Sequence, residues 1–531
     1  MAIMDMAMVE KTSKYMLIIK TLALTCLLLC GSSFAGEWRF TPTLGLTETY
    51  TDNVNLMQID TQSSLVSQFI IGVDSNFSSE KLQFSLSGTE SLVGYSHESQ
   101  LNDDYQTLQA NSTYKIWDNK LQAIFSSSIT NVSNNDSNNS LADLVSGDTI
   151  QQINNSAGLQ YNNANSDYSL SSVFTYNVVN TEDNIGESNG YIALINSENG
   201  NAARAIFWQV NGSFSHQENN LFNNESYQFE TKIGAITTYK INPFIRFYNE
   251  KVSGSTAGNN PDAIPSWGPG LRYQAASNFI IDLSYNYVDD TEVSDNYLSA
   301  DIDWQPSART SIKANYSKRF FGDSYALDFS HRTKKLTNTV SYDETIEVFD
   351  RNNFTTIDNI IWCPNGAFEL TDCLPLGEIP TNTNDYQNIT ISALELIESN
   401  EFSLNKRLSW LSTLAFTRTT FTLDISSRER ESLTSDIIDN YITARFSVSR
   451  RISTRSSVTV FADYRDNTFD KDRPDGPRQE DTYKTFSANY TRSLASSLNA
   501  FLTLQFIDRQ SNIERFIYNE ARVSINLTKD F

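Results

Sequence analysis

Three histidines, His97, His216 and His331, are the candidate imidazole bases of this chain. A hydrolase of the serine type needs such an imidazole beside a hydroxyl nucleophile and a carboxylate that orients the ring. The single G-x-S-x-G match, GESNG at residues 186–190, does not indicate a nucleophile elbow, because that elbow leads into a helix and no segment after Gly36 has a helical period. The histidines also stand far apart in the sequence. We therefore predict that the chain is not an enzyme.

The first 35 residues have the layout of a secretory signal peptide. Basic residues precede and enter an apolar run from Met16 to Cys30, and Ser33-Phe34-Ala35 forms a small-x-small cleavage site. Lys20 interrupts the run and leaves too little apolar length for a membrane anchor, and a leucine stands where lipoprotein processing at Cys30 needs a small residue. We expect the mature chain to begin at Gly36, and we interpret residues 1–15 as an overlong start.

Two cysteines, Cys363 and Cys373, belong to the exported part of the chain, in the segment IWCPNGAFELTDC. Export places them in an oxidising compartment, where a close pair normally becomes a disulfide. A metal site would want further cysteine or histidine ligands nearby, and the sequence has none there. We predict a Cys363–Cys373 disulfide, no metal and no cofactor.

From Gly36 onward the chain alternates apolar and polar residues with a period of two, as strands with one apolar face do. In the last segment, Ala521–Phe531, one face carries Val523, Ile525, Leu527 and Phe531, and the other face is polar. Similar runs begin at Phe69, Tyr168, Tyr227, Phe279, Leu298, Ile442 and Leu498. Each run is about the ten residues that a tilted strand needs to cross a bilayer. The pattern indicates strands that span a membrane.

The connections between these runs alternate between short and long. Short turns are expected at 78–81, 117–120, 239–243, 276–278, 305–309, 331–335, 449–453 and 492–496, and long loops at 49–64, 131–148, 251–266, 349–385 and 465–481. Short turns at one rim and long loops at the other are typical of outer-membrane barrels. The prediction is an all-β fold, a single large antiparallel transmembrane β-barrel over residues 36–531, with about 24 strands (roughly 20 to 26). Both termini would be periplasmic, and a large extracellular loop would lie at about 349–400.

The overall composition narrows the partners of such a chain. Its net charge of −23 excludes nucleic acid, because phosphate binding needs clustered lysine and arginine. The hydrophobic fraction of 39% is low, but only alternate residues of a barrel strand meet lipid. We expect outer-membrane lipid and the barrel assembly machinery as partners.

The polar faces of the strands would line a wide interior. The candidate lumen-lining residues mix both signs of charge: Glu230, Lys232, Arg272, Asp282, Asp301, Asp303, Lys313, Arg445, Asp463 and Arg522. One interpretation is a water-filled, weakly selective conduit. The other is that these residues pair across strands and solvate a lumen closed by inward-folded loops. The sequence leaves both open, because open and plugged barrels share a hydrophilic interior.

Two stretches carry a family resemblance. Residues 38–54 read WRFTPTLGLTETYTDNV, and residues 400–430 read NEFSLNKRLSWLSTLAFTRTTFTLDISSRER. The first resembles the mature start of the PEP-CTERM-system-associated outer membrane β-barrel proteins, and the second is similar to a Lys-Arg-containing hairpin of that family. The cysteine-bearing loop before it also fits. The resemblance implies a role beside exopolysaccharide production and the sorting of PEP-CTERM proteins to the surface of Gram-negative bacteria, and it implies no active-site residues.

Taken with this resemblance, the sequence predicts a non-enzymatic β-barrel in the cell outer membrane of a Gram-negative bacterium. Its expected role is to support exopolysaccharide export or surface display, as a conduit, with exopolysaccharide or its export apparatus as partner. A general diffusion porin is the alternative. A hydrolase carried on the barrel wall is the third hypothesis.

Overall fold

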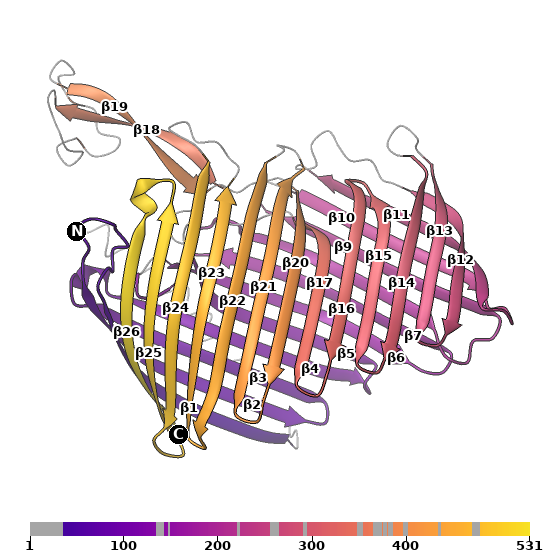
Figure 1. The fold of residues 1–531 in the computed structure, drawn as a ribbon, viewed down its shortest axis with the longest axis horizontal. Helices are drawn as coiled ribbons and strands as arrows, with labels where there is room; N and C mark the ends of the chain where they lie inside the picture. Colours follow the sequence, from indigo (N-terminus) through magenta and orange to yellow (C-terminus); the bar gives the residue numbers. More distant parts are fainter. Residues whose placement is uncertain are drawn as a thin grey trace.

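The alternating sequence forms long antiparallel strands that close into a barrel. The computed structural model describes residues 36–133, 143–146, 149–219, 223–254, 265–289, 295–347, 354–364, 374, 380, 386–396, 402–433, 437–469 and 478–531. These residues form one barrel sheet of 24 strands and a separate two-stranded sheet (Figure 1). The predicted fold class and strand number are confirmed. The predicted signal peptide, residues 1–35, lies outside the described residues.

The barrel strands follow one another in chain order. They are β1 (Gly36–Thr51), β2 (Ser64–Ser79), β3 (Leu82–Tyr95), β4 (Asp103–Trp117), β5 (Leu121–Ser133), β6 (Thr149–Ala164), β7 (Tyr168–Thr181), β8 (Ser188–Asn199), β9 (Ile206–Glu218), β10 (Asn223–Ala235), β11 (Ile241–Gly254), β12 (Ser266–Ala276), β13 (Phe279–Val288), β14 (Tyr297–Ser307), β15 (Thr310–Arg319), β16 (Gly322–Arg332), β17 (Leu336–Glu347), β20 (Ser403–Ala415), β21 (Thr419–Ser432), β22 (Ile438–Ser453), β23 (Ser456–Phe469), β24 (Gln479–Ser493), β25 (Leu498–Ser511) and β26 (Tyr518–Asp530). Among the connecting residues that the structure describes, Ser99–Leu101 and Glu514–Phe516 form short 3₁₀ turns.

Pairing of the first strand with the last closes the sheet. The register runs from Thr43 opposite Asp530 to Thr51 opposite Arg522, and the backbone N–H of Phe531 donates to the Pro42 carbonyl at 2.9 Å. Closure removes the two free edges that an open sheet would have, although residues 36–42 of β1 extend beyond its pairing with β26. The C-terminal segment predicted from the sequence is therefore the closing strand.

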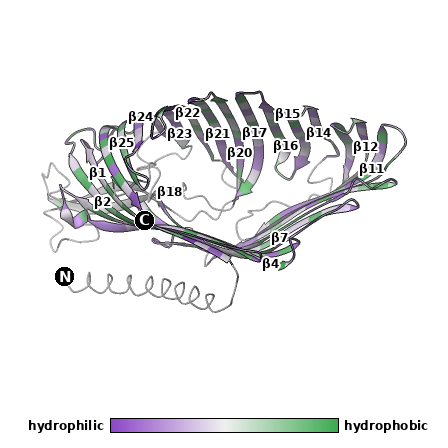
Figure 2. Cartoon of the chain, turned by 90° about the horizontal axis from the view of Figure 1, so that it is seen from below, coloured by the Kyte–Doolittle hydropathy of each residue, from purple (hydrophilic) through white to green (hydrophobic). Residues whose placement is uncertain are grey.

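The two faces of the wall differ as the alternation predicts. On β26, Val523 and Ile525 are 42% and 53% exposed, whereas Arg522, the residue before Val523, is buried. On β13, Leu283 and Tyr285 are exposed and Asp282 is buried. Apolar and polar residues alternate along the strands all round the ring (Figure 2). The outer face is apolar and the inner face polar.

Connection length separates the two rims, with exceptions. At the rim where Gly36 and Phe531 lie, here the terminal rim, the connections have two to six residues; the other rim, the loop rim, carries the longer ones. The loop rim nevertheless also has connections of two to six residues, at 182–187, 219–222, 320–321, 433–437 and 512–517. The turn expected at 449–453 was placed wrongly, because β22 continues through Ser453, and the turn expected at 239–243 lies at 236–240.

A hairpin outside the barrel occupies the connection between β17 and β20. Its strands, β18 (Phe354–Pro364) and β19 (Tyr386–Leu396), pair with each other, while β17 pairs directly with β20. The large loop expected at about 349–400 thus contains strands of its own (Figure 1). Cys363, at the end of β18, is buried and disulfide-bonded. Cys373 lies outside the described residues, so its pairing with Cys363 stays a prediction.

Candidate functional site on the inner wall

Ion pairs between strands that are not neighbours identify the inner wall. The Lys232 ammonium on β10 contacts the Asp301 carboxylate on β14 at 2.5 Å. Strands in a sheet lie about 4.8 Å apart, so four strand spacings measure about 19 Å along the wall. Two side chains can bridge that separation only on the concave side of a curved sheet. Lys232 and Asp301 therefore face the interior.

Lys232 is the centre of a buried charge cluster, here the Lys232 cluster, which also contains Asp282, Asp301 and Arg272. The Lys232 ammonium donates to Asp282 at 3.1 Å as well as to Asp301. Arg272 grips Asp282 with two parallel hydrogen bonds, Nε to Oδ1 and Nη2 to Oδ2, both 2.7 Å. Such bidentate, charge-assisted pairs are stronger than single neutral hydrogen bonds. The side chains of Lys232 and Asp282 are 5% and 4% exposed, so the cluster is a desolvated network.

A second network lies nearer the loop rim, on β10, β11, β13, β14 and β15. The Arg246 guanidinium donates to Glu230 at 2.6 Å, and also to Asn286, Tyr297 and Ser317. Further along, Arg319 on β15 pairs with Glu250 on β11. Sequence reasoning named Glu230 but missed Arg246, Arg319 and Glu250. Their signal was available, since each shares the strand parity of a polar inner residue.

A cavity of about 320 Å³ opens beside the Lys232 cluster. It brings together six of the ten predicted lumen residues: Lys232, Arg272, Asp282, Asp301, Asp303 and Lys313. Glu198, Gln209 and Asp328 also line it. Along the wall Lys313 stands opposite Asp303 on one side and Asp328 on the other. We call this space the charged cavity.

The remaining predicted residues lie elsewhere. Glu230 joins the network of Arg246, and Arg445 pairs with Asp463 at 2.9 Å on β22 and β23. Arg522 on β26 pairs with Glu520 at 2.5 Å and with Asp143 at 2.9 Å. The ten residues predicted to line the lumen thus fall into three places. Most belong to the charged cavity or to the adjacent Arg246 network, two form the separate Arg445–Asp463 pair, and Arg522 lies near the loop rim.

The contact of Arg522 shows that part of a loop folds inward. Asp143 belongs to the connection between β5 and β6, whereas Arg522 is on the closing strand. Next to Asp143, the Leu144 carbonyl accepts a hydrogen bond from the Tyr95 hydroxyl at 2.6 Å. Val145 packs in a buried apolar cluster with Val54, Val66, Val93, Tyr95 and Tyr105. Residues 143–146 therefore line the interior near the loop rim.

The three histidines have different partners. His97 Nδ1 lies 2.8 Å from the Ser64 hydroxyl, and His331 Nδ1 lies 2.8 Å from the Thr310 hydroxyl. His216 stacks on Tyr191 and lies 3.6 Å from Glu218 and 3.4 Å from Glu225. Within the described part of the chain, none of the three contacts both a hydroxyl and a carboxylate, the combination that a catalytic triad needs.

Neither a metal centre nor a membrane-spanning helix is found among the described residues. In those ranges no group of three or more His, Cys, Asp or Glu side chains is arranged to hold a metal ion. The part of the chain that the structure describes has no helix long and apolar enough to cross a membrane.

The architecture and the inner wall together define a class. A closed barrel with an apolar outer face, a polar inner wall and short turns at one rim is a transmembrane β-barrel of the outer-membrane type. No family model and no curated protein matches the chain.

Several solved structures have a similar arrangement of strands. The siderophore receptor PirA from Pseudomonas aeruginosa is 8% identical with a TM-score of 0.40, over 93% of this chain and 80% of that one. The FrpB iron transporter from Neisseria meningitidis (F5-1 variant, apoprotein) is 9% identical with a TM-score of 0.40, over 92% and 81%. A loop L8 deletion mutant of OmpT, an outer membrane protein of Vibrio cholerae, is 9% identical with a TM-score of 0.33, over 94% and 100%. With TM-scores below 0.5 these likenesses carry no weight for function, which has to be inferred from this chain's own residues.

Proposed function

We propose that this chain is a non-enzymatic conduit in the outer membrane that supports exopolysaccharide export or surface display. The observation that carries the proposal is the polar, charged inner wall inside a closed barrel whose outer face is apolar. An inner wall of this kind keeps water and polar cargo away from lipid. The terminal rim would face the periplasm, and the loop rim with its hairpin β18–β19 would face outward.

The exopolysaccharide part of the proposal has separate support. It comes from the resemblance of residues 38–54 and 400–430 to PEP-CTERM-associated barrels. The second stretch folds as the hairpin β20–β21, and its Lys406 pairs with Glu429 at 2.8 Å and Glu431 at 3.0 Å. Exopolysaccharide or its export apparatus is the proposed partner, beside outer-membrane lipid and the barrel assembly machinery.

Planar-bilayer recording of the purified barrel tests the conduit. We expect stepwise ohmic conductance when single barrels insert. A protein that is folded by heat-modifiable gel migration but conducts at no voltage would overturn the proposal. Because residues 143–146 fold inward, the variant Asp143→Ala should also be recorded. It removes the ion pair between Asp143 and Arg522, and we expect a higher or more strongly fluctuating conductance.

Deletion of the gene from its host tests the role in export. Surface polysaccharide should fall while its intracellular precursors remain, and a plasmid copy of the gene should restore it. Unchanged surface polysaccharide with slower uptake of small solutes would instead favour a general diffusion porin, the second candidate. The mixed signs of the inner wall favour that candidate, because such a wall discriminates weakly between solutes.

The non-enzymatic part of the proposal draws on the histidine contacts. If the barrel cleaved lipid or polymer and the cleavage vanished on replacing His97, His216 or His331, a hydrolase on the wall would replace the conduit as the primary function.

A further inference from the structure

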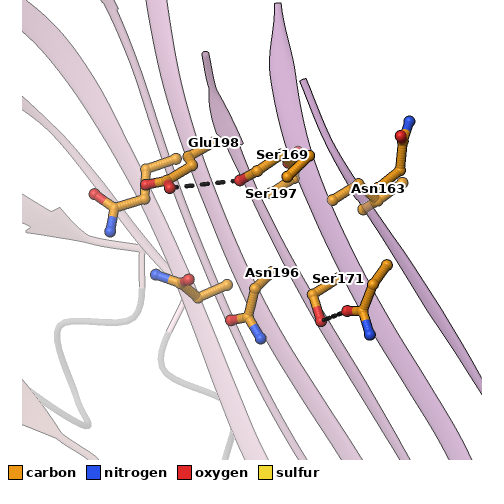
Figure 3. A pocket seen from close by; sticks show the side chains of 11 residues that line it. Asn163, Ser169, Ser171, Asn196, Ser197 and Glu198 are labelled. Atoms are coloured by element: carbon orange, nitrogen blue, oxygen red, sulfur yellow. Dashed lines mark hydrogen bonds between the residues drawn. The ribbon is translucent and has the colours of Figure 1, made fainter. Parts of the chain in front are cut away.

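Next to the charged cavity the inner wall is built almost entirely from amides and hydroxyls. A groove of about 340 Å³ lies there over β6 to β9, between the turns 165–167 and 200–205 and the middle of the wall. Its inward side chains, which we call the amide groove, are Asn162, Ser169, Ser171, Asn196, Glu198, Gln209 and Asn211 (Figure 3). Glu198 is the single ionisable group among them.

The amide groove is an ordered array, because the strand register sets its rows. In one row Asn162, Ser171, Asn196 and Asn211 stand opposite one another on four successive strands. In the second row Ser169, Glu198 and Gln209 do the same. Neighbouring members of a row are about 4.8 Å apart, and the rows are two residues, or about 7 Å, apart. These spacings are on the scale of one sugar ring.

The groups are also oriented and accessible. The Ser171 hydroxyl donates to the Asn162 carbonyl oxygen at 2.7 Å, which turns the Asn162 NH₂ group away from Ser171. Arg272 donates to the Gln209 carbonyl oxygen at 3.3 Å and so ties the groove to the rigid Lys232 cluster. The amides of Asn196 and Asn211 make no side-chain hydrogen bond to a described residue, and Asn196 is exposed.

We propose that the amide groove binds an uncharged polyhydroxylated chain, a neutral oligosaccharide segment. Amides and hydroxyls both donate and accept hydrogen bonds, as sugar hydroxyls do. An anionic ligand would meet no cation inside the groove and would approach Glu198. A cationic ligand would find better partners in the charged cavity beyond it. The chemistry of the groove therefore selects a neutral polyol.

The position of the groove gives it a direction. Asn162, Ser169 and Gln209 lie within four residues of the ends of their strands at the terminal rim. A chain entering at that rim meets the amide groove before it reaches residues 143–146 near the loop rim. This inference rests on the proposed function and deepens it: the groove is the loading site of a conduit whose cargo arrives from the periplasm.

Calorimetric titration of the purified barrel with maltoheptaose tests the proposal. The detergent should carry no sugar headgroup, because a maltoside would compete for the groove. We expect saturable binding of maltoheptaose and at least about tenfold weaker binding of an oligogalacturonate of the same length, since its carboxylates lack cationic partners. The double variant Asn196→Ala/Asn211→Ala should weaken maltoheptaose binding by about fivefold or more.

Asn177→Ala is the matched control, because Asn177 is an amide on the same face of β7 but outside the groove. It should bind maltoheptaose as the unmodified barrel does, and all variants should keep heat-modifiable migration. No binding of maltoheptaose, preference for the acidic oligomer, or a folded double variant that binds normally would each overturn the proposal. A barrel that binds maltoheptaose without conducting would sink the conduit and leave the groove standing. A barrel that conducts but binds no oligosaccharide would overturn the groove and leave the conduit standing.

Discussion

At the scale of single residues, the inner wall depends on how each buried charge is compensated. Lys232 touches two carboxylates and Asp282 touches two cations, so neither sign is left alone in the interior of the cluster. Lys313 carries the same charge on the same wall but makes no ion pair with a described residue and is exposed. The difference in burial therefore assigns Lys232 a structural role and leaves Lys313 available to solutes.

Lys232→Ala should destabilise the barrel by about 3 kcal/mol, because it leaves buried carboxylates without their ammonium partner. The estimate is at the low end for a broken buried pair, since Asp282 keeps Arg272. The measurement is the free energy of unfolding in denaturant, with the protein in lipid vesicles. Lys313→Ala is the matched control and should change that free energy little. Equal effects of the two substitutions would contradict the assigned roles.

The sequence predicted which residues would face inward better than it predicted which would meet. Parity along a strand is a local property, so Lys232, Asp282 and Asp301 were all identified. The pairing of Lys232 with Asp301, 69 residues away, depends on how sharply the wall bends between β10 and β14. No local pattern encodes that curvature. The inward position of Asp143 is likewise a tertiary contact that its polar loop sequence does not reveal.

At the scale of elements, β12 shows how a strand tolerates residues that weaken pairing. Pro269 has no backbone N–H, and the β12–β13 register passes over Gly268 and Pro269. A Cβ on Gly268 would overlap the Tyr285 carbonyl oxygen on β13. Glycine at this position is required by the close approach of the two backbones.

Gly268→Ala should therefore destabilise the barrel by about 1–3 kcal/mol, the usual range for overpacking. Gly94→Ala on β3 is the control, because the nearest side-chain atom to its Cβ would be Asn102 Oδ1 at 3.8 Å. It should be neutral or slightly stabilising, since alanine reduces the entropy of the unfolded chain. The measurement is the free energy of unfolding of both variants in denaturant. An unchanged value for Gly268→Ala would show that β12 and β13 can move apart without loss of stability.

The hairpin β18–β19 is an element that the sequence only half revealed. The length and polar content of this segment predicted a large loop. The alternation of apolar and polar residues does not show that two strands within that loop pair with each other outside the barrel. Because β17 pairs directly with β20, the barrel ladder is complete without the hairpin.

The cysteine pair should therefore matter to the hairpin and not to the barrel. The unfolded, unreduced mature protein should show no free thiol, and Cys363→Ser should release one. The double variant Cys363→Ser/Cys373→Ser should keep the heat-modifiable migration of the barrel. Thiol titration under denaturing conditions makes the first measurement. Two reactive thiols in the unmodified mature protein would show that the pair is not bonded.

At the scale of the whole molecule, the barrel is a flattened ring. Seen along its axis it is elongated, and β11 and β12 form one narrow end (Figure 2). Side chains from β10 to β15 meet there because the wall turns back on itself. The networks of Lys232 and Arg246 fill this bend, which places the charged cavity and the amide groove side by side on the adjoining wall, where both are lined by Glu198 and Gln209.

The charge balance of that wall predicts the ion preference of the conduit. The charged cavity holds five carboxylates (Glu198, Asp282, Asp301, Asp303 and Asp328) against three cations (Lys232, Arg272 and Lys313), and the chain as a whole carries −23. We expect cation preference, measured as the sign of the reversal potential across a bilayer that separates two KCl concentrations.

The preference should fade as the salt rises towards 1 M, where the screening length falls to about 3 Å. Asp303→Asn/Asp328→Asn removes the two carboxylates that flank Lys313 without touching the Lys232 cluster, so it should lower cation preference while the unfolding free energy changes little. Asp60→Asn in the β1–β2 loop is the control: it removes one exposed charge, and asparagine suits the positive φ of 60° there. Anion preference in the unmodified barrel, or a double variant as cation-selective as Asp60→Asn, would mean that ions do not pass along this wall.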